Sequence, residues 1–281
     1  MNIFLRKFEL SYSRQKNTLI HFFAQRICPR STHHLFNFLF ACAIVCASVS
    51  FTHAETITLV SEDNWYPYAA LKDGKITGFA VDVIAAAYAK MNINVEFISA
   101  PYSRCLMLTK TGRALGCFDS LNDLSLTRDF LFHHEPLFKA AIGIYSASKN
   151  SSTINEIGLR GHIVGVTHEY TYGDAIEADK KIVREVAPSD LSNLRKLLKG
   201  RSEYSLVYTR IVDHLQVAYP EEFKGNIHQV GVAFEDNLFV SFSKIWPDAK
   251  RYANLLDQGL IAIRADGTYK KLEHKWATPA K

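Results

Sequence analysis

The feature that most constrains the fold is a repeated alternation between segments with strand periodicity and segments with helix periodicity. Residues 57–60 and 93–98 alternate as strands do. Between them, Ile84, Ala87 and Tyr88 fall on one helical face. Strands that alternate with helices form parallel sheets whose faces the helices cover. The sequence therefore predicts an α/β fold.

Two later helices carry recognisable start and stop signals. Residues 188–190 read Pro-Ser-Asp and precede a leucine stripe that ends at Gly200. Pro247 precedes a second, longer apolar stripe, and Gly267 is expected to end that helix before a shorter one begins. The strand–helix alternation thus continues to the last part of the chain.

The first 54 residues have the order of a secretory leader. A basic segment comes first, residues 31–54 contain no Asp, Glu, Lys or Arg, and the apolar run over residues 35–51 ends near the small residue Ala54. We expect residues 1–54 to be a signal peptide that is removed after Ala54, so that Glu55 begins the mature chain. An uncleaved membrane anchor is the alternative, since the apolar run is at the short limit for spanning a bilayer.

Net charge argues against nucleic acid as a partner. Six of the 33 Lys and Arg and one of the 28 Asp and Glu precede residue 55, so the rest of the chain holds 27 of each and is neutral. No basic stripe with interleaved aromatic residues remains to contact a polyanion.

Motifs of catalysis and metal binding are absent from the sequence beyond the leader. It contains no nucleophile elbow, zinc-protease motif, phosphate loop or Cys-x-x-Cys. His133 and His134 are adjacent and would point to opposite faces of a strand, so we expect a solvated turn before Pro136 and no metal site. No cofactor is predicted.

Cys105 and Cys117 are the two cysteines beyond the leader. If a helix covers residues 103–111 and a strand returns from Ala114, the two cysteines lie level with each other at the end of the strand. A disulfide is then plausible in an oxidising compartment, and two buried thiols are the alternative.

Two glycine-containing blocks carry a family resemblance. Residues 74–82 contain Gly74 and Gly78 around a turn that feeds a helix, and residues 263–269 contain Gly267. Both resemble the solute-binding proteins of polar amino-acid ABC transporters, the bacterial family 3. The resemblance implies a periplasmic binding protein-like fold of type II, with two α/β lobes joined by two hinge strands.

The lobe boundaries are expected where the pattern restarts. A strand over residues 140–145 is followed by a polar stretch and a new strand-first unit. The resemblance then implies a discontinuous lobe 1, residues 55–145 plus 238–281, and a lobe 2 of residues 146–237.

The first ligand-contacting residues are expected after the first strand, because open parallel sheets bind small molecules at the carboxyl ends of their strands. Residues 62–68 resemble the family's acidic, aromatic and proline segment. Glu62, Trp65 and Tyr66 are therefore expected at the ligand, with Trp65 stacked on it, while Tyr68 is expected to plug the lobe.

An arginine is expected to hold a ligand carboxylate, because its guanidinium donates two parallel hydrogen bonds. Residues 125–128 resemble the family's Ser/Thr-x-x-Arg segment, which implies this role for Arg128. Arg104 is the other candidate. Asp119 and Ser120 are expected to line the cleft beside them.

Lobe 2 is expected to supply hydroxyl and backbone donors. Residues 166–173 resemble the family's strand-to-helix turn, which implies that Thr171, Tyr172 and the amides of the helix start contact an anion. Tyr208 lies in a segment where many relatives place an aspartate for the ligand's α-ammonium group. This chain has no carboxylate there.

That departure leaves two readings of the ligand. Glu62, Asp63 or Asp119 replaces the missing carboxylate, or the ligand is not an ordinary α-amino acid, because a buried ammonium group needs a charged partner.

The function implied is that of a periplasmic solute-binding protein, not an enzyme. It would be a monomer that captures a small polar ligand, an amino acid or a related carboxylate or amine, and delivers it to an ABC-transporter permease in the inner membrane. The alternatives are an enzyme resembling cyclohexadienyl dehydratases, with His168 or Glu169 as acid or base, and a sensing module for a membrane partner.

Overall fold

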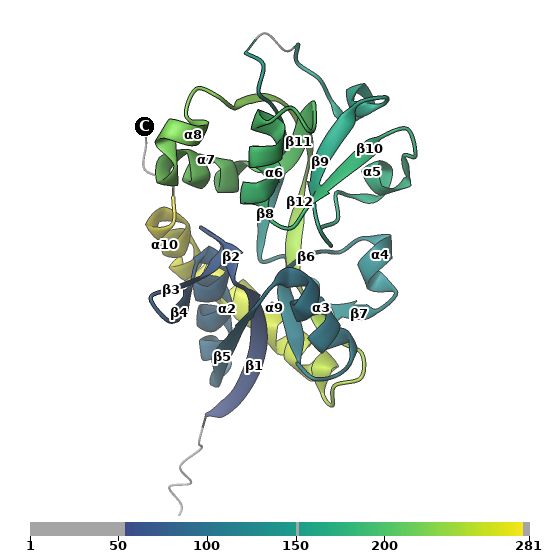
Figure 1. The fold of residues 1–281 in the computed structure, drawn as a ribbon. Coiled ribbons are helices and arrows are strands. Elements are labelled where there is room, and N and C mark those ends of the chain that lie inside the picture. The colour runs from purple at the N-terminus through teal and green to yellow at the C-terminus, as the bar shows by residue number, and fades with distance from the viewer. Residues whose placement is uncertain (1–53, 150–151, 278–281) are drawn as a thin grey trace, which may run out of the picture. The chain divides into compact units, whose positions relative to one another are not determined.

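One mixed sheet runs through the part of the chain that the structure describes (Figure 1). The computed structural model describes residues 54–149 and 152–277, so the predicted leader lies outside the described residues except for Ala54. Within these ranges the sheet has nine strands in the order β10-β9-β11-β8-β12-β6-β1-β5, with β7 also paired to β12. A separate three-stranded sheet has the order β2-β3-β4.

The strands are β1 (Glu55–Glu62), β2 (Asn64–Trp65), β3 (Ala69–Lys72), β4 (Lys75–Thr77), β5 (Ile93–Ala100), β6 (Gly116–Leu121), β7 (Phe130–Phe132), β8 (Phe138–Ser146), β9 (Ile163–Thr167), β10 (Val183–Ala187), β11 (Tyr204–Tyr208) and β12 (His228–Ser243). The helices are α2 (Phe79–Lys90), α3 (Tyr102–Lys110), α4 (Leu124–Thr127), α5 (Asp174–Ala178), α6 (Asp190–Leu198), α7 (Thr209–Ala218), α8 (Pro220–Phe223), α9 (Ala249–Ala265) and α10 (Thr268–Lys275), with a 3₁₀ turn η1 (Glu156–Leu159). None of these helices is long and apolar enough to cross a membrane.

Two groups of parallel strands are joined by antiparallel ones. β1 pairs in parallel with β5 and β6, and β9 pairs in parallel with β10 and β11. β8 and β12 pair with each other antiparallel and pass between the two groups (Figure 1). This arrangement confirms the predicted α/β class, and it brings the ends of β1, β6 and β11 toward the same region.

The glycine-bracketed turn before α2 has the predicted form. Gly78 has a φ of 150°, and a Cβ at this position would lie 2.0 Å from the carbonyl oxygen of Tyr68. Only glycine fits such a close approach. α2 then packs against α9 and β5 through its buried face, so this turn fixes both the helix and the segment that carries Trp65.

β12 is longer than its sequence pattern indicates. The alternation predicted a strand over residues 237–243, whereas the strand begins at His228. Two register shifts, after Gln229 and after Val232, interrupt its pairing with β8. A bulge breaks the period of two by which a strand is recognised, which explains why the first half was missed.

The prediction of a solvated turn at His133 is wrong. The His133 side chain is buried, its Nε2 accepts a hydrogen bond from the Val240 amide at 2.8 Å, and its Nδ1 lies 3.3 Å from Asp257. The same carboxylate accepts hydrogen bonds from the amides of His134 and Glu135. A side chain 124 residues distant along the chain therefore holds this turn, and no local pattern reveals such a contact.

Cys105 and Cys117 form a disulfide, which settles the alternatives left open by the sequence. The bridge joins α3 to β6, with the two Cα atoms 5.5 Å apart. Both cysteines are buried in a small apolar cluster that includes Tyr102 and Leu126. The bridge thereby fixes α3 on the sheet beside the strand that carries Asp119.

Candidate functional site

A small cavity lies where the ends of several strands meet. The residues that line it are Glu62, Trp65, Tyr102, Asp119, Leu121, Tyr170, Thr171 and Tyr208. The space inside it is about 10 Å³. That is room for roughly one water molecule, so this conformation is too tight to admit an amino-acid-sized solute.

Glu62 ends β1 and lines the cavity. Its side chain is buried, and its Oε1 accepts a 2.5 Å hydrogen bond from the Tyr170 hydroxyl. Burial raises the pKa of Glu62 well above its usual range; the hydrogen bond from Tyr170 opposes this, and the negative charges of Asp190 and Asp119 add to it. A cationic group entering the cavity would favour the ionised form of this carboxyl.

Asp119 in β6 is the second carboxyl of the cavity. It is buried, and neither of its oxygens has a hydrogen-bond partner among the described residues. Its φ of 67° is unusual for a residue other than glycine, although aspartate tolerates it better than most. Burial raises the pKa of Asp119 well above its usual range. A buried carboxyl without a hydrogen-bond partner is available to bind a polar group of a ligand.

Asp190 lies close behind the cavity wall, at the first turn of α6. Its Oδ1 accepts a hydrogen bond from the Thr167 hydroxyl at 2.5 Å, while burial raises the pKa of Asp190 to about 6. The nearby carboxyl group strengthens the negative potential at Glu62.

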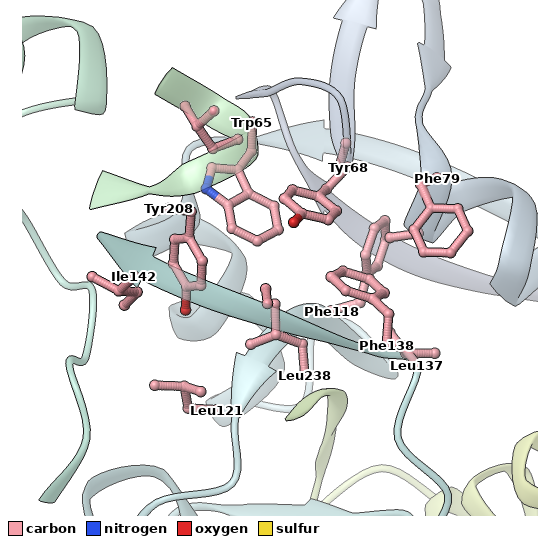
Figure 2. Packing of buried hydrophobic residues seen from close by; sticks show 14 of the residues in the cluster. Trp65, Tyr68, Phe79, Phe118, Leu121, Leu137, Phe138, Ile142, Tyr208 and Leu238 are labelled. Atoms are coloured by element: carbon pink, nitrogen blue, oxygen red, sulfur yellow. The ribbon is translucent and has the colours of Figure 1, made fainter. Parts of the chain in front are cut away.

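Aromatic rings form much of the remaining wall. Trp65 stacks on Tyr68 with ring centroids 4.5 Å apart and meets Tyr208 edge to face at 4.9 Å. Figure 2 shows the Trp65 ring between these two tyrosines, with Phe138 on the far side of Tyr68 from Trp65. Tyr68 is buried and stacks in turn on Phe138 at 4.7 Å, in accord with the predicted plug. The apolar core thus extends directly into the cavity wall.

Three lining residues were not predicted from the sequence: Tyr102, Leu121 and Tyr170. Tyr102 and Tyr170 meet edge to face at 5.5 Å. Tyr102 begins the helix in which Arg104 had been chosen, and its hydroxyl donates to Ser120 at 3.0 Å. Residues i and i+2 of a helix point about 200° apart. This spacing alone could have indicated that Tyr102 and Arg104 face different surroundings.

Both candidate arginines lie outside the cavity, contrary to what the resemblance implies. Arg104 is exposed on α3. Arg128 follows α4, its side chain is 78% exposed, and it lies 3.4 Å from Asp129. Asp123 caps the start of α4 through the amides of Ser125 and Leu126, and Arg128 follows the end of this four-residue helix on the surface.

Three other predicted residues, Ser120, Tyr66 and Tyr172, do not line the cavity. Ser120 is fully buried, and its hydroxyl is hydrogen-bonded to the hydroxyls of Tyr102 and Ser241. Tyr66 packs on His214 and Trp276 at a different surface. Tyr172 is buried, with its hydroxyl accepting from the Thr167 amide at 2.6 Å.

The turn before α5 offers little to an anion. Thr171 lines the cavity, but the Tyr172 amide already donates to Glu177 at 3.0 Å. The first turn of this five-residue helix also holds two acidic residues, Asp174 and Glu177. Negative side chains at a helix start compete with an anionic ligand for the same amides.

Comparison with known proteins identifies the family. Residues 57–279 match the family model of bacterial extracellular solute-binding proteins, family 3. The probable amino-acid-binding protein YxeM of Bacillus subtilis (strain 168) is 24% identical over 222 residues, which cover 75% of this chain and 80% of that protein.

Solved structures show the same fold. An ancestral arginine-binding protein bound to arginine has a TM-score of 0.68 and 19% identity, covering 80% of this chain and all of that one. A histidine kinase sensor domain similar to periplasmic binding proteins has a TM-score of 0.67 and 20% identity, covering 80% and 97%. The match to the family model covers most of the chain, and this protein therefore belongs to the bacterial extracellular solute-binding proteins of family 3.

Proposed function

We propose that this chain is a periplasmic solute-binding protein that captures a small polar solute by closing two lobes around it. Lobe 1 would comprise residues 55–145 and 238–281, and lobe 2 residues 146–237. The observation that carries the proposal is the origin of the cavity walls. Some lining residues come from the first set and others from the second, as closure around a ligand requires.

Polar contacts that cross the proposed boundary support a hinged closure. The Tyr170 hydroxyl donates to Glu62, and the Leu124 amide donates to Asp174 at 3.2 Å. Hydrogen bonds of this kind exchange readily for bonds to water, so each contributes only about 1 kcal/mol net. An opening motion that breaks them is therefore energetically accessible.

The partner we propose is the permease of an ABC importer, which would read the closed form of the monomer at the inner membrane. YxeM and the arginine-binding structures are described as binders of amino acids, which supports an organic solute for this chain. The similarity to a kinase sensor domain supports a sensing role at the level of the fold. Delivery of the solute to a permease would distinguish transport from sensing.

One observation supports the alternative of an enzyme of the cyclohexadienyl dehydratase type. Glu62 and Asp119 are buried carboxyls with a raised pKa, and such groups can act as general acids. His168 and Glu169, the candidates from the sequence, are exposed and lie 3.6 Å apart. Prephenate and arogenate each carry two carboxylates, and no cationic side chain is among the described residues that line the cavity. Binding is therefore the better-supported function.

The test begins with the full chain expressed in a Gram-negative host and purified from the periplasmic fraction. Mass spectrometry should find Glu55 at the N-terminus. Amino acids, polyamines, dicarboxylates and small aromatic acids are then screened by thermal shift, where a ligand of the folded state raises the melting temperature with its concentration. A saturable shift without product formation is expected. Turnover of prephenate or arogenate, or no shift by any compound, would contradict the proposal.

A further inference from the structure

Asp119 is an unusual group for a protein to bury without a partner. It is only 7% exposed, both of its oxygens lack hydrogen bonds within the described residues, and it faces the cavity. An ionised carboxylate taken out of water is strongly unfavourable unless it is paired and hydrogen-bonded. Its oxygens can be satisfied by a group that donates N–H bonds and carries positive charge.

Other acidic groups reinforce the demand for a cation. Glu62 lines the same cavity and has one hydrogen bond from Tyr170, which leaves its second oxygen available for another donor. Asp190 stands behind the wall. Lysine, arginine and histidine are absent from the described lining residues. The cavity wall therefore holds carboxyl groups without a compensating side-chain cation, and a bound cation would favour their ionised, negative forms.

The groups that would hold a ligand carboxylate are directed elsewhere. Arg128 and Arg104 are exposed outside the cavity. The Tyr172 amide at the turn before α5 is occupied by Glu177. A carboxylate brought beside Asp119 would lose its hydration without gaining a cationic partner, and it would oppose ionisation of the Asp119 carboxyl.

The aromatic wall suits a cation as well. The rings of Trp65, Tyr102, Tyr170 and Tyr208 all line the cavity. The face of an aromatic ring attracts an ammonium or guanidinium group, and this attraction grows when water is excluded. A quaternary ammonium would use the rings but could not donate hydrogen bonds to Asp119, so the unpartnered oxygens favour a cation that bears N–H groups.

We propose that this cavity selects a small organic cation with N–H groups and no carboxylate, an aliphatic amine or a guanidine, and discriminates against the α-amino acid of the same side chain. This inference rests on the proposed solute-binding function and narrows its ligand. The cation would bind Asp119 and the free oxygen of Glu62, with the aromatic rings around its carbon chain.

Matched pairs that differ by one carboxylate test the inference directly. Binding of agmatine against arginine, cadaverine against lysine, and putrescine against ornithine is measured by isothermal titration calorimetry on the protein purified from the periplasm. We expect the decarboxylated member of at least one pair to bind about tenfold or more tightly than its amino acid, because a carboxylate in this cavity has no partner.

The outcomes separate the inference from the proposed function. Equal or tighter binding of the amino acids, or binding only of anionic compounds in the wider screen, overturns the inference and leaves solute capture standing. No binding of any compound overturns both.

A variant pair then assigns the contact. Asp119→Asn removes the charge while keeping the shape, and it should weaken binding of the amine by about 10- to 100-fold. Asp73→Asn is the matched control, since Asp73 is an exposed aspartate that also has a positive φ, of 50°. Circular dichroism and melting temperature verify that both variants are folded. Unchanged affinity in folded Asp119→Asn would overturn the assignment.

Discussion

Two carboxyl groups give the cavity its chemical character at the residue scale. Glu62 ends β1 and Asp119 lies in β6, and the sheet brings them to one small volume although 57 positions separate them in the sequence. Both have a raised pKa because they are buried. Each therefore retains its proton in the folded protein at pH values where the unfolded chain has lost it.

This shift predicts a pH-dependent gain in stability for Asp119→Asn. Because the folded-state pKa is raised, the stability cost is absent below the unfolded pKa of about 4 and grows as pH rises toward the folded value. Near pH 7 the variant should be more stable than the wild type by about 1–3 kcal/mol, and near pH 4 the two should agree. Urea denaturation at the two pH values measures the difference. A variant less stable near pH 7 would contradict the cause we assign.

The sequence located these carboxyls but not all of their neighbours. Glu62 and Asp119 stand at or near strand ends, where parallel sheets place ligand contacts, and this topological rule does not require side-chain detail. Arg128 was chosen by local resemblance, yet it follows a helix of only four residues and its side chain is exposed. Tyr170 reaches Glu62 across a distance of 108 residues, and such a contact has no periodicity to detect.

The disulfide between α3 and β6 is the main covalent constraint on the cavity at the scale of elements. α3 begins with Tyr102 and β6 carries Asp119 and Leu121, so the bridge between Cys105 and Cys117 joins the elements that supply three of the lining residues. Strand and helix periodicity predicted both elements to within a few residues. The bond itself required the three-dimensional distance.

Replacement of both cysteines, Cys105→Ala with Cys117→Ala, should lower the free energy of unfolding. Closing a loop with a sequence separation of 12 restricts the unfolded chain, which is worth about 3 kcal/mol. Guanidinium denaturation with and without reductant measures the effect. Reductant should destabilise the wild type and leave the double variant unchanged. A wild type insensitive to complete reduction, verified by thiol titration, would contradict the prediction.

The turn between β7 and β8 depends on one side chain of α9. Asp257 accepts the amides of His134 and Glu135 and contacts His133. Asp257→Ala leaves buried donors without a partner and should cost about 2–4 kcal/mol of stability. Gln258→Ala, on the exposed face of the same helix, should change it by less than about 0.5 kcal/mol. Equal melting temperatures in the two variants would show that the turn does not depend on this carboxylate.

At the scale of the whole molecule, the cavity is smaller than the proposed solute, so we expect the two proposed lobes to separate before a solute enters. The hydroxyl of Tyr170 donates a hydrogen bond to one oxygen of Glu62, and the proposed cation would bind the other oxygen. Opening would break the contact between Tyr170 and Glu62, because the two residues lie in different proposed lobes, so this contact stabilises the closed form.

Tyr170→Phe should shift the free protein toward the open form. Loss of one hydrogen bond of about 1 kcal/mol changes the open–closed equilibrium about fivefold. Small-angle X-ray scattering should show a larger radius of gyration than in the wild type without ligand. Tyr219→Phe is the control, because Tyr219 packs on Phe223 away from the cavity. A radius unchanged in Tyr170→Phe would mean that this contact does not hold the closed form.

The pairing of β8 with β12 has a mechanical consequence. The two strands that pass between the groups of parallel strands are hydrogen-bonded to each other along most of β8. Bending one strand alone would break the hydrogen bonds between β8 and β12. We therefore expect the two strands to bend together as a single hinge. Rotation of the proposed lobes about such a hinge would have essentially one axis. A membrane partner would then recognise a single angle between the two lobes, whichever lobe the solute contacts first.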